Sequence, residues 1–380
     1  MYIKSLQLKD FRNYDTCDLS FTPGIHILYG DNAQGKTNIL ESVFLAATTK
    51  SHRGSKDQEM IHFEKEEAHI RSLWDKEGIE YRIDMHLRKQ KSKGIAVNGQ
   101  NLKRTSQLMG ICSVVFFSPE DLSIVKEGPS ERRRFMDMEL CQIDASYLYH
   151  LNQYHKVLNQ RNKMLRDYFP GSRSYSASGQ NGGHFDQEQD FIEVLSVWDQ
   201  QLLDYGRKII QRRQSFLMDL NEIMKDVHGE ISGGKEEILI SYEPDTTADD
   251  FEENLKKSKD RDIKYKTTNV GPHKDDVLFS INGIDVRKYG SQGQQRTTAL
   301  SLKLSEIEMI KRIRHDSPVL LLDDVLSELD ANRQNFLLDK IGDIQTIITC
   351  TGVDEFVSRR MKLDKVYRVE NGVCKIMNES

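Results

Sequence analysis

A glycine-rich loop near the N-terminus carries the residue types that hold nucleotide phosphates. Residues 30–37 read GDNAQGKT and fit the pattern G-x-x-x-x-G-K-[ST] in full. The glycines let the backbone N–H groups face one point, Lys36 places a cation against the β- and γ-phosphates, and Thr37 offers a hydroxyl to Mg²⁺. We therefore predict an ATP-binding segment in which Lys36 also has a catalytic role, made of Gly30, Asp31, Asn32, Ala33, Gln34, Gly35, Lys36, Thr37 and Asn38.

A second set of chemical groups follows a short apolar run. Residues 319–324 read VLLLDD, so Asp323 appears at the C-terminal end of a buried strand, where α/β sheets place their ligands. A carboxylate at this edge is suited to hold Mg²⁺ opposite Thr37. Asp324 is the candidate catalytic residue that polarises the attacking water. Solvated acids are common at strand ends, so the phosphate-binding loop is what favours this interpretation.

A third motif supplies a further anion site at a helix start. Residues 291–295 read SQGQQ and precede a helix pattern that runs to about 314. Ser291 and Gly293 present a hydroxyl and backbone N–H groups at the positive end of that helix. The same pattern also suits an ordinary capped helix, and it has no evident phosphate partner in its own chain.

The remaining sequence predicts the elements that position these motifs. Strand-like segments surround one helix in residues 1–118, long helical patterns fill residues 119–266, and strand patterns return in residues 267–380. Asn98-Gly99 and Asn282-Gly283 suit two-residue hairpin turns. The polar residues 171–184 are predicted to form a mobile loop joining two antiparallel helices, and residues 244–266 to be exposed. The fold class is therefore α/β, split by a helical insertion.

Composition narrows the class of protein. The 380 residues carry a net charge of −5, which excludes a uniformly basic nucleic-acid coat and leaves only local basic patches. No window approaches the roughly 18 apolar residues of a membrane span, and no signal-peptide pattern opens the chain. The five cysteines form no CxxC pair. We expect a cytoplasmic protein in a reducing setting, with no membrane partner.

The ordered motifs GDNAQGKT, SQGQQ, VLLLDD and SELD (residues 327–330) resemble those of ABC-type ATPases. The spacing of 254 residues between Thr37 and Ser291 is longer than in transporter ATPases and shorter than in SMC proteins. It resembles that of the RecF family of DNA replication and repair proteins. Further stretches resemble the same family along most of the chain, namely LKDFRNY, SHR, VVFFSPEDL, KEGPSERRRFMD, YHKVLNQRNKML, WDQQL and GPHKDD.

The resemblance implies an ABC-type head, with a mixed β-sheet and helices, split by a helical arm. It implies that ATP binds between two heads of a homodimer, where Ser291, Gly293 and Gln294 of one chain meet the γ-phosphate held by the other. Ser327 and Asp330 would lie at the dimer contact. The expected activity is a weak, DNA-stimulated ATPase that acts as a switch. The expected partners are duplex and gapped DNA, RecR and RecO, in RecA loading, recombinational repair and the SOS response.

Several positions depart from the wider ABC pattern or match it weakly. Asp324 stands where most relatives carry Glu, and Thr351 stands where many place a histidine, and both departures suit slow hydrolysis. Gln58 is the candidate for the glutamine that usually joins the metal site. By resemblance, Arg12 and Asn13 approach the nucleotide, although an ordinary turn would read the same way.

Clusters of Lys and Arg indicate where DNA phosphates could be neutralised. Residues 86–104 hold six basic residues and no acid around a predicted hairpin. A solvated face is the alternative for each cluster. The predicted DNA contacts are Arg88, Lys89, Lys91, Lys93, Lys103, Arg104 and Arg132.

Three other functions remain open from the sequence. They are an ABC transport ATPase, a nuclease-linked or other SMC-like repair ATPase, and a scaffold whose ATPase is inert. Dependence on a membrane permease would favour the transport ATPase, and metal-dependent DNA cleavage would favour the nuclease-linked ATPase. DNA and partner activities that do not change in Lys36→Met would favour the inert scaffold.

Overall fold

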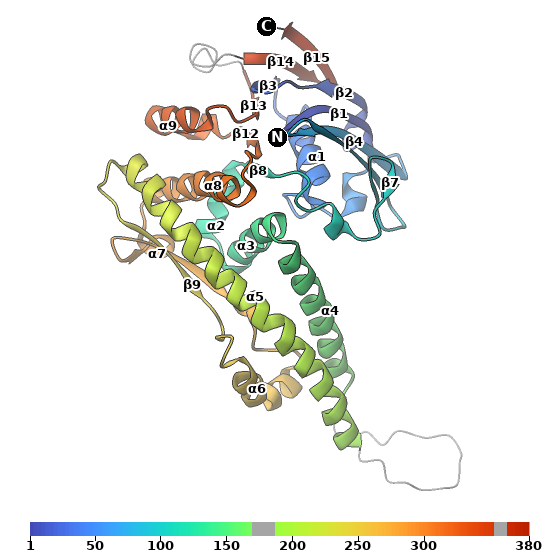
Figure 1. The fold of residues 1–380 in the computed structure, drawn as a ribbon, viewed down its shortest axis with the longest axis vertical. Coiled ribbons are helices and arrows are strands. Elements are labelled where there is room, and N and C mark those ends of the chain that lie inside the picture. The colour runs from blue at the N-terminus through green and yellow to red at the C-terminus, as the bar shows by residue number, and fades with distance from the viewer. Residues whose placement is uncertain (169–186, 353–362, 380) are drawn as a thin grey trace.

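The computed structural model describes residues 1–168, 187–352 and 363–379. Two six-stranded sheets form a head, and a pair of long helices extends from it as an arm (Figure 1). The predicted loop 171–184 lies outside the described residues, so its expected mobility stays a prediction.

The first sheet is antiparallel and has the order β2-β1-β4-β5-β6-β7. Apolar residues alternate along its strands, as in β4, where Ala68, Ile70 and Trp74 point into the core. Asn98 and Gly99 have φ values of 50° and 80° and close the predicted hairpin between β6 and β7. Its strands are β1 (Tyr2–Phe11), β2 (Tyr14–Ser20), β4 (Glu67–Lys76), β5 (Ile79–Arg88), β6 (Gly94–Val97) and β7 (Gln100–Asn101).

The second sheet has the order β15-β14-β3-β13-β12-β8 and is parallel except for β15. Its strands are β3 (Ile25–Tyr29), β8 (Val114–Phe117), β12 (Val319–Asp323), β13 (Thr346–Cys350), β14 (Leu363–Glu370) and β15 (Val373–Glu379). Helix α1 (Lys36–Thr48) packs with residues of both sheets and is buried along most of its length, which explains its apolar sequence. The carboxyl ends of the parallel strands meet at one edge, beside the start of α1.

The arm consists of α4 (Ala145–Asp167) and α5 (Gln187–Ser232), which lie side by side in Figure 1. Short helices α2 (Leu122–Lys126) and α3 (Pro129–Ile143) join the arm to the head. The polar stretch that we predicted to be exposed contains α6 (Phe251–Tyr265), which buries Phe251 and Asp262. Asp262 forms a fully buried ion pair with Arg161 of α4 at 2.7 Å, so its charge is compensated inside the arm.

A third, small sheet has the order β11-β10-β9 and lies along the arm. It contains β9 (Ile238–Glu243), β10 (Asp276–Ile281) and β11 (Ile284–Asp285). The proposed boundary at residue 266 therefore falls between two strands of one sheet. The chain then returns to the head through α7 (Val286–Tyr289), α8 (Gln292–Arg314) and α9 (Ala331–Ile341).

Candidate nucleotide-binding site

The predicted phosphate loop connects β3 to α1 and depends on two glycines. Gly30 and Gly35 have φ values of 154° and 107°. A Cβ atom at Gly35 would lie 2.5 Å from Asn13 Nδ2, and one at Gly30 would lie 2.2 Å from the carbonyl oxygen of Val369. Both positions therefore require glycine for conformation and for space.

Lys36 opens α1 and turns its side chain back over the loop. Its Nζ donates to the carbonyl oxygens of Gly30 at 2.5 Å and Asp31 at 2.8 Å. The cation thus lies against its own loop, where it can exchange carbonyl partners for phosphate oxygens. The free N–H groups at the start of α1 add positive potential at the same point.

Thr37 and Asp323 meet at the end of the parallel sheet. Thr37 Oγ1 donates to Asp323 Oδ1 at 2.8 Å, and Thr349 Oγ1 donates to the same carboxylate oxygen at 2.7 Å. Asp323 and Thr349 are paired in the register of β12 and β13. A carboxylate and two hydroxyls are hard oxygen donors, so this set fits Mg²⁺.

Asp324 follows directly, with φ of 54°. Its N–H points to both Thr349 O and Thr349 Oγ1, at 3.2 and 3.1 Å, and its carbonyl accepts from Ser327 Oγ at 2.7 Å. The left-handed backbone is uncommon for a residue other than glycine, and these contacts hold it in place. Asp324 lines the same cavity as the phosphate loop.

That cavity has a volume of about 380 Å³ and includes residues that the sequence analysis missed. Ser118 and Glu120 come from the segment after β8, and Arg53 comes from the segment after α1. A signal existed for Ser118, because it follows the buried run VVFF as Asp323 follows VLLL, and β8 pairs with β12. Thr349 carried no such sequence signal, because only the pairing of β12 with β13 places it beside Asp323.

Arg12 and Asn13, which we expected to approach the nucleotide, both lie outside the lining of the nucleotide cavity, and they have different partners. The guanidinium of Arg12 donates to both carboxylate oxygens of Glu41, at 2.9 and 3.0 Å, to Ser55 Oγ and to the carbonyl of Glu59. Burial favours the neutral form of Glu41, but hydrogen bonds from Arg12 and Ser51 outweigh it and lower the pKa of this carboxyl. Arg12 is thus a structural cation that does not line the nucleotide cavity.

Asn13 instead supports the loop directly. Its Nδ2 donates to the carbonyl of Gln34 at 3.0 Å, and its Oδ1 accepts from Asn38 Nδ2 at 2.8 Å. The side chain therefore bridges the phosphate loop and the first turn of α1.

The structure also corrects the expectation for Gln58. This residue lies in a short 3₁₀ turn, Asp57–Met60. It lines a different cavity, which includes Thr49 and Lys50 just after the C-terminal end of α1. The nucleotide cavity is lined instead by the segment after β8, which contributes Ser118 and Glu120. Strand adjacency decides this, because β8 borders β12 while residues 57–60 do not belong to the parallel sheet.

The SQGQQ motif of residues 291–295 lies at the start of α8, as expected. Ser291 caps the helix through a hydrogen bond from Gln294 N to its Oγ at 3.2 Å, and Gln294 Oε1 accepts from Ser291 N at 3.0 Å. Gly293, Gln294 and Asp330 line a cavity of about 660 Å³ with Ser291. This cavity shares no lining residue with the nucleotide cavity.

The predicted DNA contacts divide into buried and exposed groups. Arg132 is only 2% exposed, and its Nε and Nη2 donate to both oxygens of Asp276, at 2.6 and 3.0 Å. Lys93 is held by Asp57 at 2.7 Å and by the carbonyl of Thr49. The predicted DNA contact is therefore wrong for Arg132, whose side chain is buried. The ammonium group of Lys93 is already bound to partners within the protein. Lys103 and Arg104 are exposed but lie away from the cavity described next.

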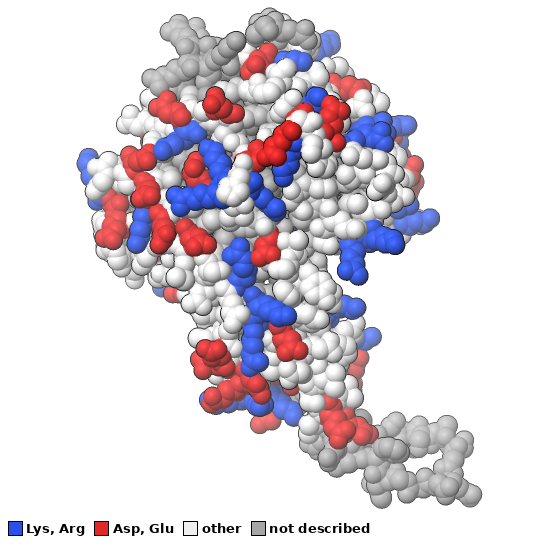
Figure 2. Space-filling view, in the orientation of Figure 1, with Lys and Arg blue, Asp and Glu red and all other residues white. Residues whose placement is uncertain are grey.

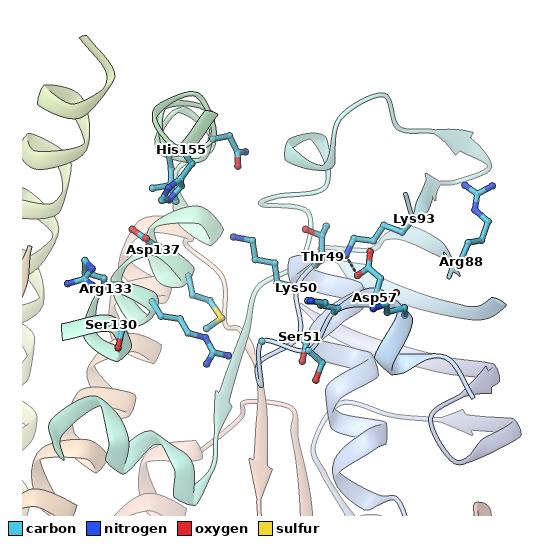
Figure 3. Close-up of a pocket in the computed structure, with 18 of the residues that line it drawn as sticks. Thr49, Lys50, Ser51, Asp57, Arg88, Lys93, Ser130, Arg133, Asp137 and His155 are labelled. Carbon is cyan, nitrogen blue, oxygen red and sulfur yellow. Dashed lines mark hydrogen bonds and ion pairs between the residues drawn. The ribbon is translucent and has the colours of Figure 1, made fainter. Parts of the chain in front are cut away.

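A basic groove of about 810 Å³ runs between the head and the base of the arm. Figure 3 shows Lys50 projecting from the head side toward Arg133, Asp137 and His155 on the arm side. On the face drawn in Figure 2, Lys and Arg also predominate at the outer edge of the β4–β7 lobe. The Lys and Arg residues of the groove outnumber its two acids, Asp57 and Asp137; they are Lys50, Lys56, Arg88, Lys89, Lys91, Lys93, Arg133 and Arg134.

Comparisons with known proteins agree with this architecture. The model of the RecF/RecN/SMC N-terminal domain family matches residues 2–375. The chain is 55% identical over 381 residues to the DNA replication and repair protein RecF of Agathobacter rectalis, covering 100% of both chains. It is 56% identical over 372 residues to RecF of Lachnoclostridium phytofermentans, covering 98% of this chain and 99% of the relative.

Solved structures show the same fold. A structure described as the recombination mediator protein RecF with ATP in the RecFOR pathway matches with a TM-score of 0.88 and 35% identity, covering 99% of this chain and 98% of the other. An Smc head domain from Pyrococcus furiosus, with 15% identity, matches with a TM-score of 0.53, covering 99% of this chain and 96% of the other, and shares the fold alone.

The fold and the site define an ABC-type ATPase of the SMC class, with a head split by a helical arm. This confirms the predicted fold class. Within that class, the chain belongs to the RecF family of DNA replication and repair proteins.

Proposed function

We propose that this ATPase is a DNA-binding switch of recombinational repair, closed by ATP between two chains and reopened by slow hydrolysis. The observation that carries the proposal is the separation of the two anion sites. The phosphate loop and the Ser291 helix start open into different cavities of one chain. A second chain is therefore needed to bring a Ser291 motif to the phosphate loop.

The residues of the nucleotide site have distinct roles in this proposal. The backbone of residues 30–37, Lys36 and the start of α1 bind the phosphates of ATP. Thr37 and Asp323 would hold Mg²⁺, which would neutralise phosphate charge. Asp324, placed in the same cavity, orients the attacking water.

The second face of the proposed dimer comes from α8 and the segment before α9. Ser291, Gly293 and Gln294 present their hydroxyl and N–H groups to the γ-phosphate bound by the partner chain. Asp330 caps α9 by accepting from Arg333 N at 3.0 Å, and Arg333 donates to the carbonyl of Gly293 at 3.2 Å. These contacts support the proposal that Ser327 and Asp330 shape the dimer contact.

The basic groove is the proposed path of duplex or gapped DNA. Lys50, Lys56 and Lys91 are exposed there and can neutralise phosphates without sequence preference.

Partners are proposed from the relatives. The solved RecF structures are described as belonging to the RecFOR pathway, which supports RecR and RecO as partners. RecA loading is the task that the family resemblance implies. No helix in the described part of the chain is long and apolar enough to cross a membrane.

The proposal is tested by sedimentation of the purified chain with gapped duplex DNA, comparing no nucleotide, ADP and ATP. We expect ATP to produce a dimer that retains DNA, and Ser291→Arg to abolish both while still binding ATP. Ser232→Arg, which alters the same cavity but not the cap of α8, is the matched control. DNA binding that is indifferent to nucleotide and to Ser291→Arg would contradict the switch.

A further inference from the structure

Two histidines and a glutamate converge on the outer face of the first sheet, away from the ATP site. Glu67 and His69 are two residues apart on β4, and His86 pairs directly with His69 across β4 and β5. Alternation along β4 buries the intervening Ala68 against the core, so the three side chains share the opposite face. They come from adjacent strands, which gives the cluster a rigid base.

The geometry of the cluster is that of a set of metal ligands. Both Nε2 atoms face the same carboxylate, because Glu67 Oε2 lies 2.7 Å from His86 Nε2 and Glu67 Oε1 lies 3.8 Å from His69 Nε2. One ligand atom from each of the three residues lies within 4.8 Å of the other two. Tetrahedral zinc with nitrogen and oxygen ligands requires separations of about 3.3 Å, which partly exposed side chains reach by small rotations.

The two imidazoles are already arranged side by side. Their ring centroids lie 4.2 Å apart with an interplanar angle of 22°. Because His69 and His86 are direct cross-strand partners, the pairing of β4 with β5 fixes this arrangement.

The surrounding charges leave room for a cation. Lys9 pairs with His69 from β1 but is exposed and free to turn toward solvent. Arg71 on the same face is bound by Asp84 at 2.5 Å. The guanidinium of Arg88 donates to the carbonyl of Ser92 at 3.0 Å.

We propose that Glu67, His69 and His86 bind a divalent transition-metal ion, with Zn²⁺ as the best match and water completing its coordination. Two imidazoles and one carboxylate suit zinc better than Mg²⁺, which prefers oxygen ligands alone. The ion links β4 to β5 on the face of the sheet that also carries Lys9, Arg71 and Arg88. It is separate from the oxygen-only set at Thr37 and Asp323.

The test is isothermal titration of the full, reduced chain with ZnCl₂, without nucleotide because ATP chelates metal ions. We expect one equivalent to bind, and His86→Ala or Glu67→Gln to weaken it by about tenfold or more. His62→Ala, another partly buried histidine on the head surface, is the matched control and should bind as the wild type does. Co²⁺ substitution should give visible ligand-field absorption that disappears in His86→Ala.

A second control addresses the thiols. Cys17 Sγ and Cys374 Sγ lie 3.3 Å apart and are another pair of soft ligands. Zinc binding that survives His86→Ala but is lost in Cys17→Ser/Cys374→Ser would overturn the proposal, as would the absence of any zinc binding by the wild-type chain. Circular dichroism of each variant shows that loss of binding is not loss of fold.

Discussion

Thr37 Oγ1 donates a 2.8 Å hydrogen bond to Asp323 Oδ1, although 286 residues separate them in the chain. Thr37 lies in the first turn of α1, which follows β3. Asp323 ends β12, which is two strands away from β3 in the parallel sheet. Thr349, on the strand between them, donates to the same carboxylate oxygen. Strand order thus holds a hydroxyl and a carboxylate, both hard oxygen donors, side by side next to the phosphate loop.

Removing the cation of the phosphate loop should weaken nucleotide binding without unfolding the head. Lys36→Met deletes the donor to the phosphates, and we expect ATP affinity to fall by about tenfold to 100-fold, the value of one charge-assisted hydrogen bond. Titration with a fluorescent ATP analogue measures it. Lys50→Met, in the basic groove, is the control and should bind ATP normally. If Lys36→Met and the wild type bind ATP with equal affinity, Lys36 does not contact the phosphates.

Changing the residue proposed to orient water should slow turnover more than binding. Asp324→Asn keeps the size of the side chain and removes its charge, and we expect kcat to fall by about 100-fold while ATP affinity changes little. Steady-state ATPase assays and nucleotide titration separate the two effects. Glu328→Gln, a nearby exposed carboxylate, is the control. A variant Asp324→Asn that hydrolyses ATP at the wild-type rate would assign the role to another group.

Arg132 should contribute to stability and not to DNA binding. Arg132→Met leaves Asp276 without its bidentate partner, and we expect unfolding free energy to fall by about 2–3 kcal/mol. Urea denaturation gives the stability, and a DNA titration of the folded variant should match the wild type. Lys103→Met, an exposed cation, should not change stability. A loss of DNA affinity in folded Arg132→Met would restore its predicted role as a DNA contact.

A buried carboxyl cluster beside α8 should make stability fall as pH rises. Burial first, and then the neighbouring Glu306, raise the pKa of Glu139 well above its ordinary value. The folded state therefore holds this proton more tightly than the unfolded state, so ionisation above the ordinary pKa of 4.5 reduces stability. Glu139→Gln mimics the protonated form and should raise unfolding free energy by about 1 kcal/mol or more at neutral pH.

The pH dependence of Glu139→Gln provides its own check. The gain over the wild type should shrink as pH falls and vanish below 4.5, where the wild-type carboxyl becomes protonated in both states. Glu131→Gln changes a partly exposed carboxyl of the same helix and should show little gain at any pH. A gain that is independent of pH would mean that packing, not ionisation, explains the effect.

The exposed lysines of the basic groove should set the salt dependence of DNA binding. Each phosphate contact contributes about 0.9 to the slope of log affinity against log salt. Lys50→Ala, Lys56→Ala and Lys91→Ala together should reduce this slope by up to about 3 and weaken all DNA sequences alike. Lys256→Ala/Lys257→Ala removes two exposed lysines of α6 and is the control. An unchanged slope in the triple variant would place DNA elsewhere.

The sequence by itself determined the features that are local in the chain. The phosphate loop needs consecutive residues, so GDNAQGKT predicted its strand, turn and helix correctly. The same holds for the Asn98-Gly99 hairpin and for the Ser291 helix start, whose capping partner is only three residues away. The buried strand VLLLD was equally clear, because four apolar residues before two acids leave few other structures.

Only the tertiary structure decided which distant residues share a site. Strand order places Ser118 and Thr349 beside Asp323, and it directs Gln58 to a different cavity. Burial removed Arg132 from the candidate DNA contacts, although its sequence neighbours Arg133 and Arg134 line the groove. The histidine cluster arose only from the pairing of β4 with β5. The physical reason is common to all four, since pairing register and burial depend on contacts between residues far apart in the chain.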